Sequence, residues 1–236
     1  KLVPQDPSDE PASVLLERIR EQKKQMVKEG KLKAKDIKND TIIFVGEDNL
    51  HYEKFQDGTV KSIEEEIPFE VPEGWEWTRL VSISSIITDG EHKTPQRINE
   101  FQGYYLLSAR NIQNGFLSLT DVDFVDKNEF EKISKRCNPQ KNDILISCSG
   151  SIGRVAVVSD GNDYVMVRSA AMVRPININP YYLMFALQSG QLQIQMQKAS
   201  KQTAQANLFL GAIQSLLVPV PPKAEAQRIN RSAEQA

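Results

Sequence analysis

Cysteine and histidine are scarce in this chain of 236 residues, with two of each. Two cysteines do not make a disulfide framework, so we expect Cys137 and Cys148 to be reduced thiols of a cytosolic protein. Two histidines are too few for a typical zinc site. No apolar run approaches the ~18–20 residues that cross a bilayer, so we expect neither a membrane span nor a signal peptide.

A large excess of either charge is also missing, because the formal net charge is −2. The distribution along the chain is uneven. Residues 1–40 carry ten Lys and Arg against eight Asp and Glu, residues 41–75 two against nine, and residues 76–236 seventeen against fourteen. The acidic segment therefore masks a mildly basic remainder, which permits a basic face for an anionic partner.

The most informative stretch is DILISCSGSIGRVAVV, residues 143–158. Two apolar runs flank a turn of small polar residues, which predicts a β-hairpin. Gly150 and Gly153 permit backbone angles that other residues resist, and Arg154 adds a guanidinium with five donors to the serine hydroxyls. The pattern indicates a rigid corner that presents donors and one cation to an anionic partner. A tight turn with solvated serines is the open alternative.

Residues 12–30 show the alternating three- and four-residue spacing of a helical seam, after an acidic start that contains proline. The seam begins at Ala12, and the positions that we expect to face a partner helix are Leu15, Ile19, Gln22 and Met26. An isolated amphipathic rod of roughly 27 Å is marginal in water, so it needs a partner. Packing of the helix onto its own domain remains the alternative.

The remaining pattern predicts an α+β fold with a twisted, mostly antiparallel sheet, because many short strand-like runs accompany few helices. One helix is expected from Tyr181 to about Gln197, with Asn179 as its cap and Pro180 in its first turn. The expected segments are a helical segment at 1–30, a linker with a small exposed hairpin at 31–66, an α+β domain at 67–222 and the start of a further helix at 223–236.

The polar loops of the large segment hold amides, hydroxyls and cations rather than acid–base pairs. Asn and Gln pair with adenine, Arg and Lys with guanine, and serine with bases or phosphate, so these loops suit DNA. We expect phosphate contacts from Lys93, Arg97, Arg154 and Lys201 and base contacts from Arg110, Asn111, Ser149, Gln202 and Gln205, with Thr94 and Ser151 as further candidates.

Three enzymatic alternatives are weaker. Asp89 with the run 91–93, EHK, could hold Mg²⁺, but acids two apart on one turn make a poor metal cage. The run 179–182, NPYY, looks like the Asn-Pro-Pro-Tyr signature of adenine methylation but lacks the second proline, and no glycine-rich cofactor loop follows a strand. A nucleophile at Ser149 or Ser151 lacks the G-x-S-x-G elbow and a nearby histidine. A protein-interaction module without DNA binding stays open.

Several stretches together, in this order, resemble the specificity subunit of type I restriction–modification systems. They are KLVPQDPSDEPASVLLERIREQKKQMVKEGKLK, VPEGWEWTRL, DGEHKTP, LLSARNI with NDILISCSGSIGRVAVV, and AQANLFLGAIQSLLVPVPPKAEAQRI. The resemblance covers nearly the whole chain. It implies a non-catalytic DNA reader, since members of this family carry two target-recognition domains that each read half of a split site. By this resemblance, residues 1–30 would be a helical spacer, 67–222 a target-recognition domain and 223–236 the start of the distal helix.

The same resemblance implies partners. Conserved helices between the recognition domains form a spacer and dock modification subunits, and motor-nuclease subunits join for cleavage. S-adenosylmethionine, ATP and Mg²⁺ would then bind those partners, and none of them would bind this chain. The closing residues INRSAEQA depart from the family's long continuation. We therefore expect a C-terminal half, or a half-length subunit that pairs with its own copy.

Overall fold

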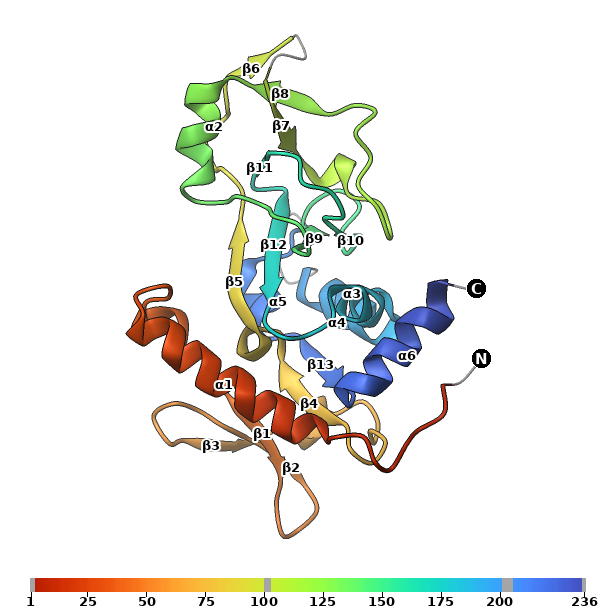
Figure 1. Ribbon diagram of the computed structural model, residues 1–236. Coiled ribbons are helices and arrows are strands. Elements are labelled where there is room, and N and C mark those ends of the chain that lie inside the picture. The colour runs from red at the N-terminus through yellow and green to blue at the C-terminus, as the bar shows by residue number, and fades with distance from the viewer. Residues whose placement is uncertain (1–2, 100–102, 201–205, 235–236) are drawn as a thin grey trace. The chain divides into compact units, whose positions relative to one another are not determined.

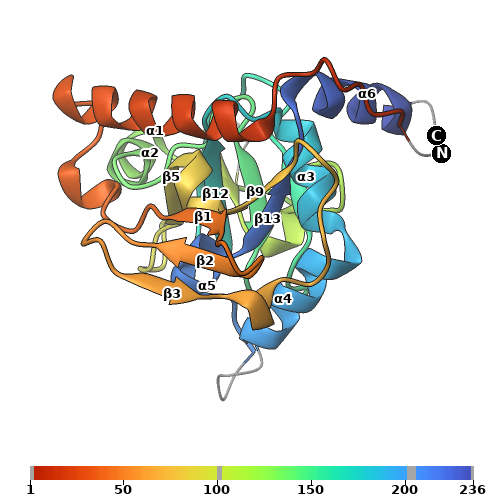
Figure 2. The same ribbon diagram turned by 90° about the horizontal axis from the view of Figure 1, so that it is seen from below.

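The computed structural model describes residues 3–99, 103–200 and 206–234 of the chain (Figures 1 and 2). Its helices are α1 (Ala12–Lys28), α2 (Lys127–Ser134), α3 (Pro180–Gln188), α4 (Gly190–Ser200), α5 (Leu210–Gln214) and α6 (Lys223–Glu234), with 3₁₀ turns η1 (Ala34–Asp36), η2 (Glu64–Glu66), η3 (Leu80–Ile83) and η4 (Ala109–Asn111). No described helix is both long and apolar enough to cross a membrane.

The strands form four sheets, and the fold class is α+β as predicted. The strands are β1 (Ile42–Val45), β2 (His51–Lys54), β3 (Val60–Ser62), β4 (Glu76–Arg79), β5 (Ser84–Asp89), β6 (Arg97–Ile98), β7 (Tyr104–Leu107), β8 (Asp123–Val125), β9 (Ile144–Ser147), β10 (Val155–Val157), β11 (Tyr164–Met166), β12 (Ala170–Pro175) and β13 (Leu217–Val220). Most pairings are antiparallel, while β11 pairs with β7 in parallel.

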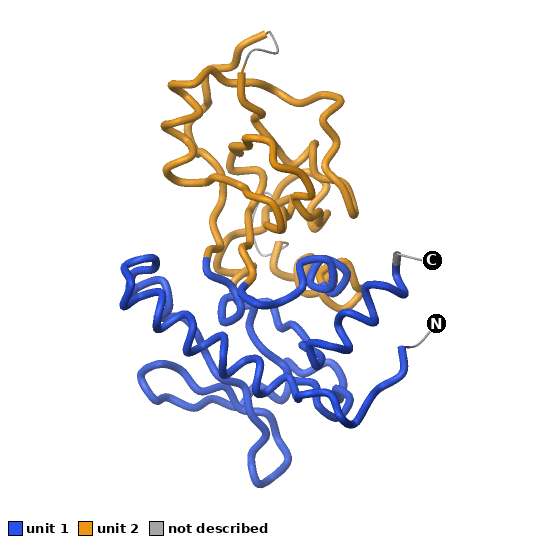
Figure 3. The backbone as a smooth tube through the Cα atoms, viewed as in Figure 1, with its two compact units in different colours: residues 1–85, 176–186, 215–236 blue, residues 86–175, 187–214 orange. Residues whose placement is uncertain are grey.

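The chain divides into two compact units, each assembled from separate stretches of sequence (Figure 3). Unit 1 contains residues 1–85, 176–186 and 215–236, and unit 2 contains residues 86–175 and 187–214. These units cut across the segments expected from the sequence. The functional division into spacer, linker, recognition domain and distal helix stays a prediction.

Helix α1 in unit 1 confirms the predicted helix, but its seam faces inward. Ala12, Leu15 and Ile19 are at most 6% exposed, and the next buried position is Lys23 rather than Gln22. The buried face packs against η3. Burial of Leu15 and Ile19 within this chain favours packing of the helix onto its own domain, and their assignment to a partner helix stays a prediction. Gln22 is exposed and Met26 half-buried.

Lys23 can be buried because its ammonium is paired with a carboxylate and also hydrogen-bonds to a backbone carbonyl. Its Nζ donates to Asp40 Oδ1 at 2.7 Å and to the Val81 carbonyl at 2.8 Å. Burial lowers the pKa of Lys23 and raises that of Asp40, since desolvation outweighs their mutual attraction. The pair therefore joins α1 to the following loop and to η3, at a desolvation cost.

The segment expected to be a small exposed hairpin is a three-stranded antiparallel sheet in the order β1, β2, β3. Its predicted hairpin is present, but one face is buried. His51 and Glu53 are each 5% exposed, and Glu53 accepts two hydrogen bonds from Arg79. The difference arises because period-2 alternation puts a charged residue on the inner face, where a cation from β4 neutralises it.

Unit 2 is organised around β9, which pairs antiparallel with β10 on one side and β12 on the other. All four residues of β9 are buried. This confirms the hairpin predicted for residues 143–158. Cys137 and Cys148 are free and buried, and burial raises the pKa of each thiol to about 12, which leaves them protonated at neutral pH.

The helix expected from Tyr181 to Gln197 is wrong as a single element. The segment is divided at Ser189 into α3 and α4. The Ser189 carbonyl accepts a hydrogen bond from the N–H of Gln193 in the first turn of α4. Gly190 follows directly, and glycine weakens a continuous helix. The start at Asn179 is confirmed, because its Oδ1 accepts the N–H of Tyr181 at 2.9 Å.

Candidate nucleic-acid interface

A polar recess of about 410 Å³ opens in unit 2 beside the β9–β10 turn. Its lining comes from three separate loops: η4, the β9–β10 turn and the turn between β11 and β12. None of the described residues that line it is acidic, and they are Ser108, Ala109, Arg110, Ser149, Gly150, Ser151, Arg154 and Ser169. The recess therefore offers hydroxyls and two guanidinium groups, and the described part of its wall contains no carboxylate.

The β9–β10 turn is held in shape by Ser147, which is 0% exposed. Its hydroxyl donates to the Ser151 carbonyl and accepts the N–H of Arg154. Its backbone groups bond to Arg154 and Gly153 across the turn. Gly150 and Gly153 have φ of +68° and +86°, the region that glycine tolerates, so the rigid corner predicted from the sequence is present.

The two arginines of the recess differ in their partners. Arg110 is paired with Asp123 at 2.8 Å, and Arg97 shares the same carboxylate at 2.8 Å. Burial raises the pKa of Asp123, but Arg97 and Arg110 together lower it by a larger amount. The pKa of Asp123 therefore lies below its ordinary value. Among the residues that the structure describes, no ion pair is found for the half-buried Arg154. Of the two arginines in the wall, Arg154 is thus the one without a paired carboxylate in the described part of the chain.

Asn111 is a structural residue, which corrects its assignment as a base contact. It is 1% exposed, and its Oδ1 accepts the Ser108 N–H at 2.9 Å while its Nδ2 donates to the Ser118 carbonyl at 3.1 Å. Both ends of the amide are thus used inside the protein. The side chain shapes η4 and leaves neighbouring Arg110 at the recess.

Ser108 and Ser169 line the recess but were not among the predicted site residues. Ser169 Oγ accepts the N–H of Ala109 at 3.0 Å, which ties two of the three loops together. Its signal in the sequence was weak, because a single polar pair between two strand-like runs is typical of any turn. Tertiary contact rather than spacing brings it to the site.

Lys93 and Thr94 are exposed on the loop after β5 and do not line the recess. Arg97, on β6, is linked to it through Asp123. Predicted residues Lys201, Gln202 and Gln205 lie outside the described residues. The recess therefore unites Arg110, Ser149, Ser151 and Arg154 from the predicted set.

The residues of the nuclease alternative are engaged elsewhere. Asp89 accepts hydrogen bonds from Arg136 and contacts His92 Nε2 at 2.7 Å. Glu91 accepts the backbone N–H of Lys93 at 2.8 Å. No group of three or more potential metal ligands occurs among the described residues. Nothing in this loop gives particular support to the nuclease alternative.

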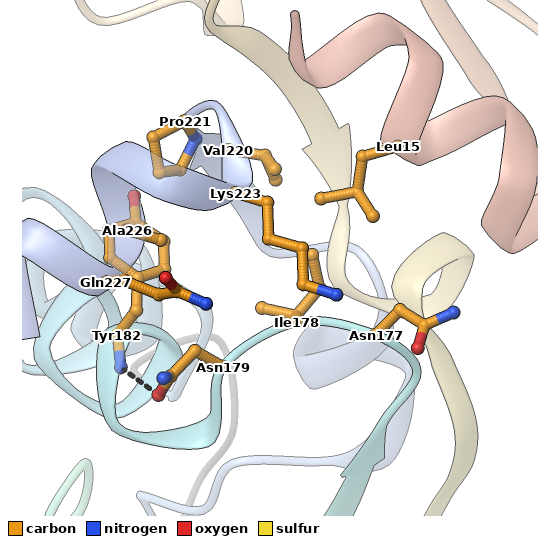
Figure 4. Close-up of a pocket in the computed structure, with 10 residues that line it drawn as sticks. All are labelled: Leu15, Asn177, Ile178, Asn179, Tyr182, Val220, Pro221, Lys223, Ala226 and Gln227. Atoms are coloured by element: carbon orange, nitrogen blue, oxygen red, sulfur yellow. Dashed lines mark hydrogen bonds between the residues drawn. The ribbon is translucent and has the colours of Figure 1, made fainter. Parts of the chain in front are cut away.

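A second cavity, of about 230 Å³, lies in unit 1 (Figure 4). Leu15 of α1, Tyr182 of α3 and Lys223 of α6 reach it, and the rest of its wall is mostly apolar with neutral amides. Its single cation makes it a poorer site for a polyanion than the recess of unit 2.

Comparisons with known proteins agree with these features. The family model described as "Type I restriction modification DNA specificity domain" matches residues 72–232. The specificity subunit of the type I restriction enzyme EcoAI from Escherichia coli is 37% identical over 62% of this chain and 21% of its own length. That of EcoEI, also from E. coli, is 28% identical over 97% of this chain and 35% of its own length.

A solved structure titled as the basis of complex assembly and conformational transition of the type I R-M system aligns with a TM-score of 0.56 and 18% identity. It covers 71% of this chain and 39% of that chain, and it supports the fold. The chain spans about a fifth to a third of the length of these two curated relatives. It belongs to the type I restriction–modification DNA specificity family.

Proposed function

We propose that this chain is a sequence-specific DNA reader of a type I restriction–modification complex, and that unit 2 reads half of a bipartite target. The observation that carries the proposal is the recess, where two arginines and four serines meet and no acidic residue is found among the described lining residues. Such donors suit phosphates and base edges. Membership of the specificity family supports the same function.

We further propose that unit 1 supplies the assembly surface. Modification subunits would dock on α1 and α6 near the cavity of Figure 4, and motor-nuclease subunits would join through them. Gln22 and Met26 stay candidates for such contacts, since neither is fully buried. S-adenosylmethionine, ATP and Mg²⁺ would bind those partner subunits in the cytoplasm. This chain itself would perform no bond-making step.

Selection from a random duplex library tests the DNA proposal. The chain is incubated alone and with modification subunits, and bound duplexes are sequenced. We expect one short motif to be enriched. Equal recovery of all sequences would contradict specific reading, and cleavage by the chain alone with Mg²⁺ would favour the nuclease alternative.

Sedimentation of the chain, alone and with modification subunits, tests the assembly proposal. We expect a mixed complex to form, and a dimer of the chain alone would support self-pairing of half-length subunits. Failure of both species to form at micromolar concentration would argue against unit 1 as an assembly surface.

A further inference from the structure

The turn at residues 149–151 presents three consecutive backbone N–H groups that have no acceptor among the described residues. Gly150 has φ of +68°, whereas the flanking serines are not among the described residues with positive φ. Alternation of the sign of φ turns successive N–H groups toward one concavity, and such concavities bind anions.

The side chains around this turn add donors of the same kind. Within the described part of the chain, the hydroxyls of Ser149 and Ser151 and the guanidinium of Arg154 have no protein partner. Ser169 Oγ accepts a backbone N–H, so its proton is available for a ligand. A cluster of N–H and O–H donors fits an oxyanion, which presents only acceptors. Guanine also presents two acceptors, O6 and N7, but it is typically read by one arginine or lysine side chain, whereas consecutive backbone N–H groups are typical of anion sites.

We propose that residues 149–151 and Arg154 form a phosphate-binding corner whose ligand is a DNA backbone phosphodiester. This inference rests on the proposed DNA-reading function and assigns Ser149 to the backbone rather than to a base. The N–H and hydroxyl groups would bond one phosphate while Arg154 pairs with it. Ser147 pre-organises the corner, so little entropy is lost on binding.

A phosphate contact sets the register of the protein on DNA and carries no sequence information. The corner should therefore contribute affinity equally for every sequence, and base reading should come from other residues of unit 2. Arg110, whose guanidinium is oriented by Asp123, is placed for that second task in the same recess.

Salt titrations of DNA binding test the corner with the variant Arg154→Ala. We expect affinity to fall roughly 10-fold for both the selected duplex and a scrambled one. The slope of log K against log salt should become smaller by about 1. The matched control is Lys141→Ala, an exposed cation at the opposite end of β9, which should change neither.

A second readout follows the backbone amides by NMR during titration with inorganic phosphate. We expect saturable shifts at residues 149–151 that are lost in Arg154→Ala and reduced in the double variant Ser149→Ala/Ser151→Ala. Titrations with ATP and with duplex DNA separate a free nucleotide from the DNA backbone as the source of the phosphate.

The outcomes are distinct. A loss confined to the selected duplex with an unchanged salt slope would make Arg154 a base reader and overturn the corner. Shifts with ATP but none with DNA would overturn the DNA ligand. Phosphate binding at the corner in a chain that binds no DNA would refute the proposed function while leaving the anion site standing.

Discussion

Arg79 in unit 1 and Arg154 in unit 2 show two opposite uses of the same side chain. Arg79 is 8% exposed and bonds to Glu53, Glu66 and the Ser215 carbonyl. Burial lowers the pKa of Arg79, but Glu53 and Glu66 together raise it by a larger amount, so the pKa lies above its ordinary value. Arg154 is half-buried in a recess, with no ion pair within the described residues.

The comparison separates structural charge from charge kept for a ligand. A buried ion must be paired within the protein, because an unpaired one costs several kcal/mol. A partly exposed arginine is solvated by water until an anion replaces that water. The predictions below test whether the two roles are separable.

The largest effect is expected for Arg79→Met, which keeps much of the side-chain volume but leaves the Glu53 carboxylate buried without its partner. We expect the free energy of unfolding to fall by about 3–5 kcal/mol in urea denaturation. Arg154→Met is the matched control and should stay within about 0.5 kcal/mol of the wild type. Equal losses would erase the distinction between the two arginines.

Ile19→Ala tests whether the α1 seam is core or partner surface. Because Ile19 is 0% exposed, we expect a loss of about 2–5 kcal/mol in the isolated chain. Met26→Ala, at a half-buried position, should cost about 1 kcal/mol or less. If Ile19→Ala left the stability unchanged but abolished subunit binding, the result would support the hypothesis that this face of α1 binds a partner helix.

The Glu53–Arg79 pair should make the stability of unit 1 depend on pH. Burial raises the pKa of Glu53, but hydrogen bonds from Arg79 and Thr41 lower it below its ordinary value of 4.5. A lowered folded-state pKa stabilises the protein above the unfolded value, and this contribution is lost as pH falls through the folded value.

Urea denaturation of wild type and Glu53→Gln measures this contribution. We expect the variant to be less stable by about 1–3 kcal/mol at neutral pH and the difference to shrink as pH falls below 4.5. A difference that stays constant with pH would mean that the charge of Glu53 does not stabilise the fold.

The smallest effect is expected for Asp123→Asn. The carboxylate neutralises Arg97 and Arg110, so its removal should raise the positive potential near the recess. We expect roughly threefold tighter binding to any duplex at low salt, fading as salt rises. Gel-shift titration measures it, and weaker binding would mean that orienting Arg110 matters more than its net charge.

The chain's local patterns were a good guide where neighbours in sequence decide the structure. The apolar runs and glycines of residues 143–158 predicted the β9–β10 hairpin, and Asn179-Pro180 predicted the start of α3. The same kind of reasoning missed Ser169 and misread Asn111. Their roles depend on hydrogen bonds to residues from other loops or later in the chain, such as Ala109 and Ser118.

By itself, the sequence determined the element types, the turn that carries Arg154 and the family, since each follows from residues close together or from ordered motifs. Only the tertiary structure decided which polar groups are used inside the protein. Apolar spacing shows that a helix has an apolar face but does not show which residues cover that face. Only the structure shows that Ile19 is buried within this chain. A cation's role likewise depends on whether folding brings a carboxylate to it. Folding does so for Arg79, whereas Arg154 has no paired carboxylate among the residues that the structure describes.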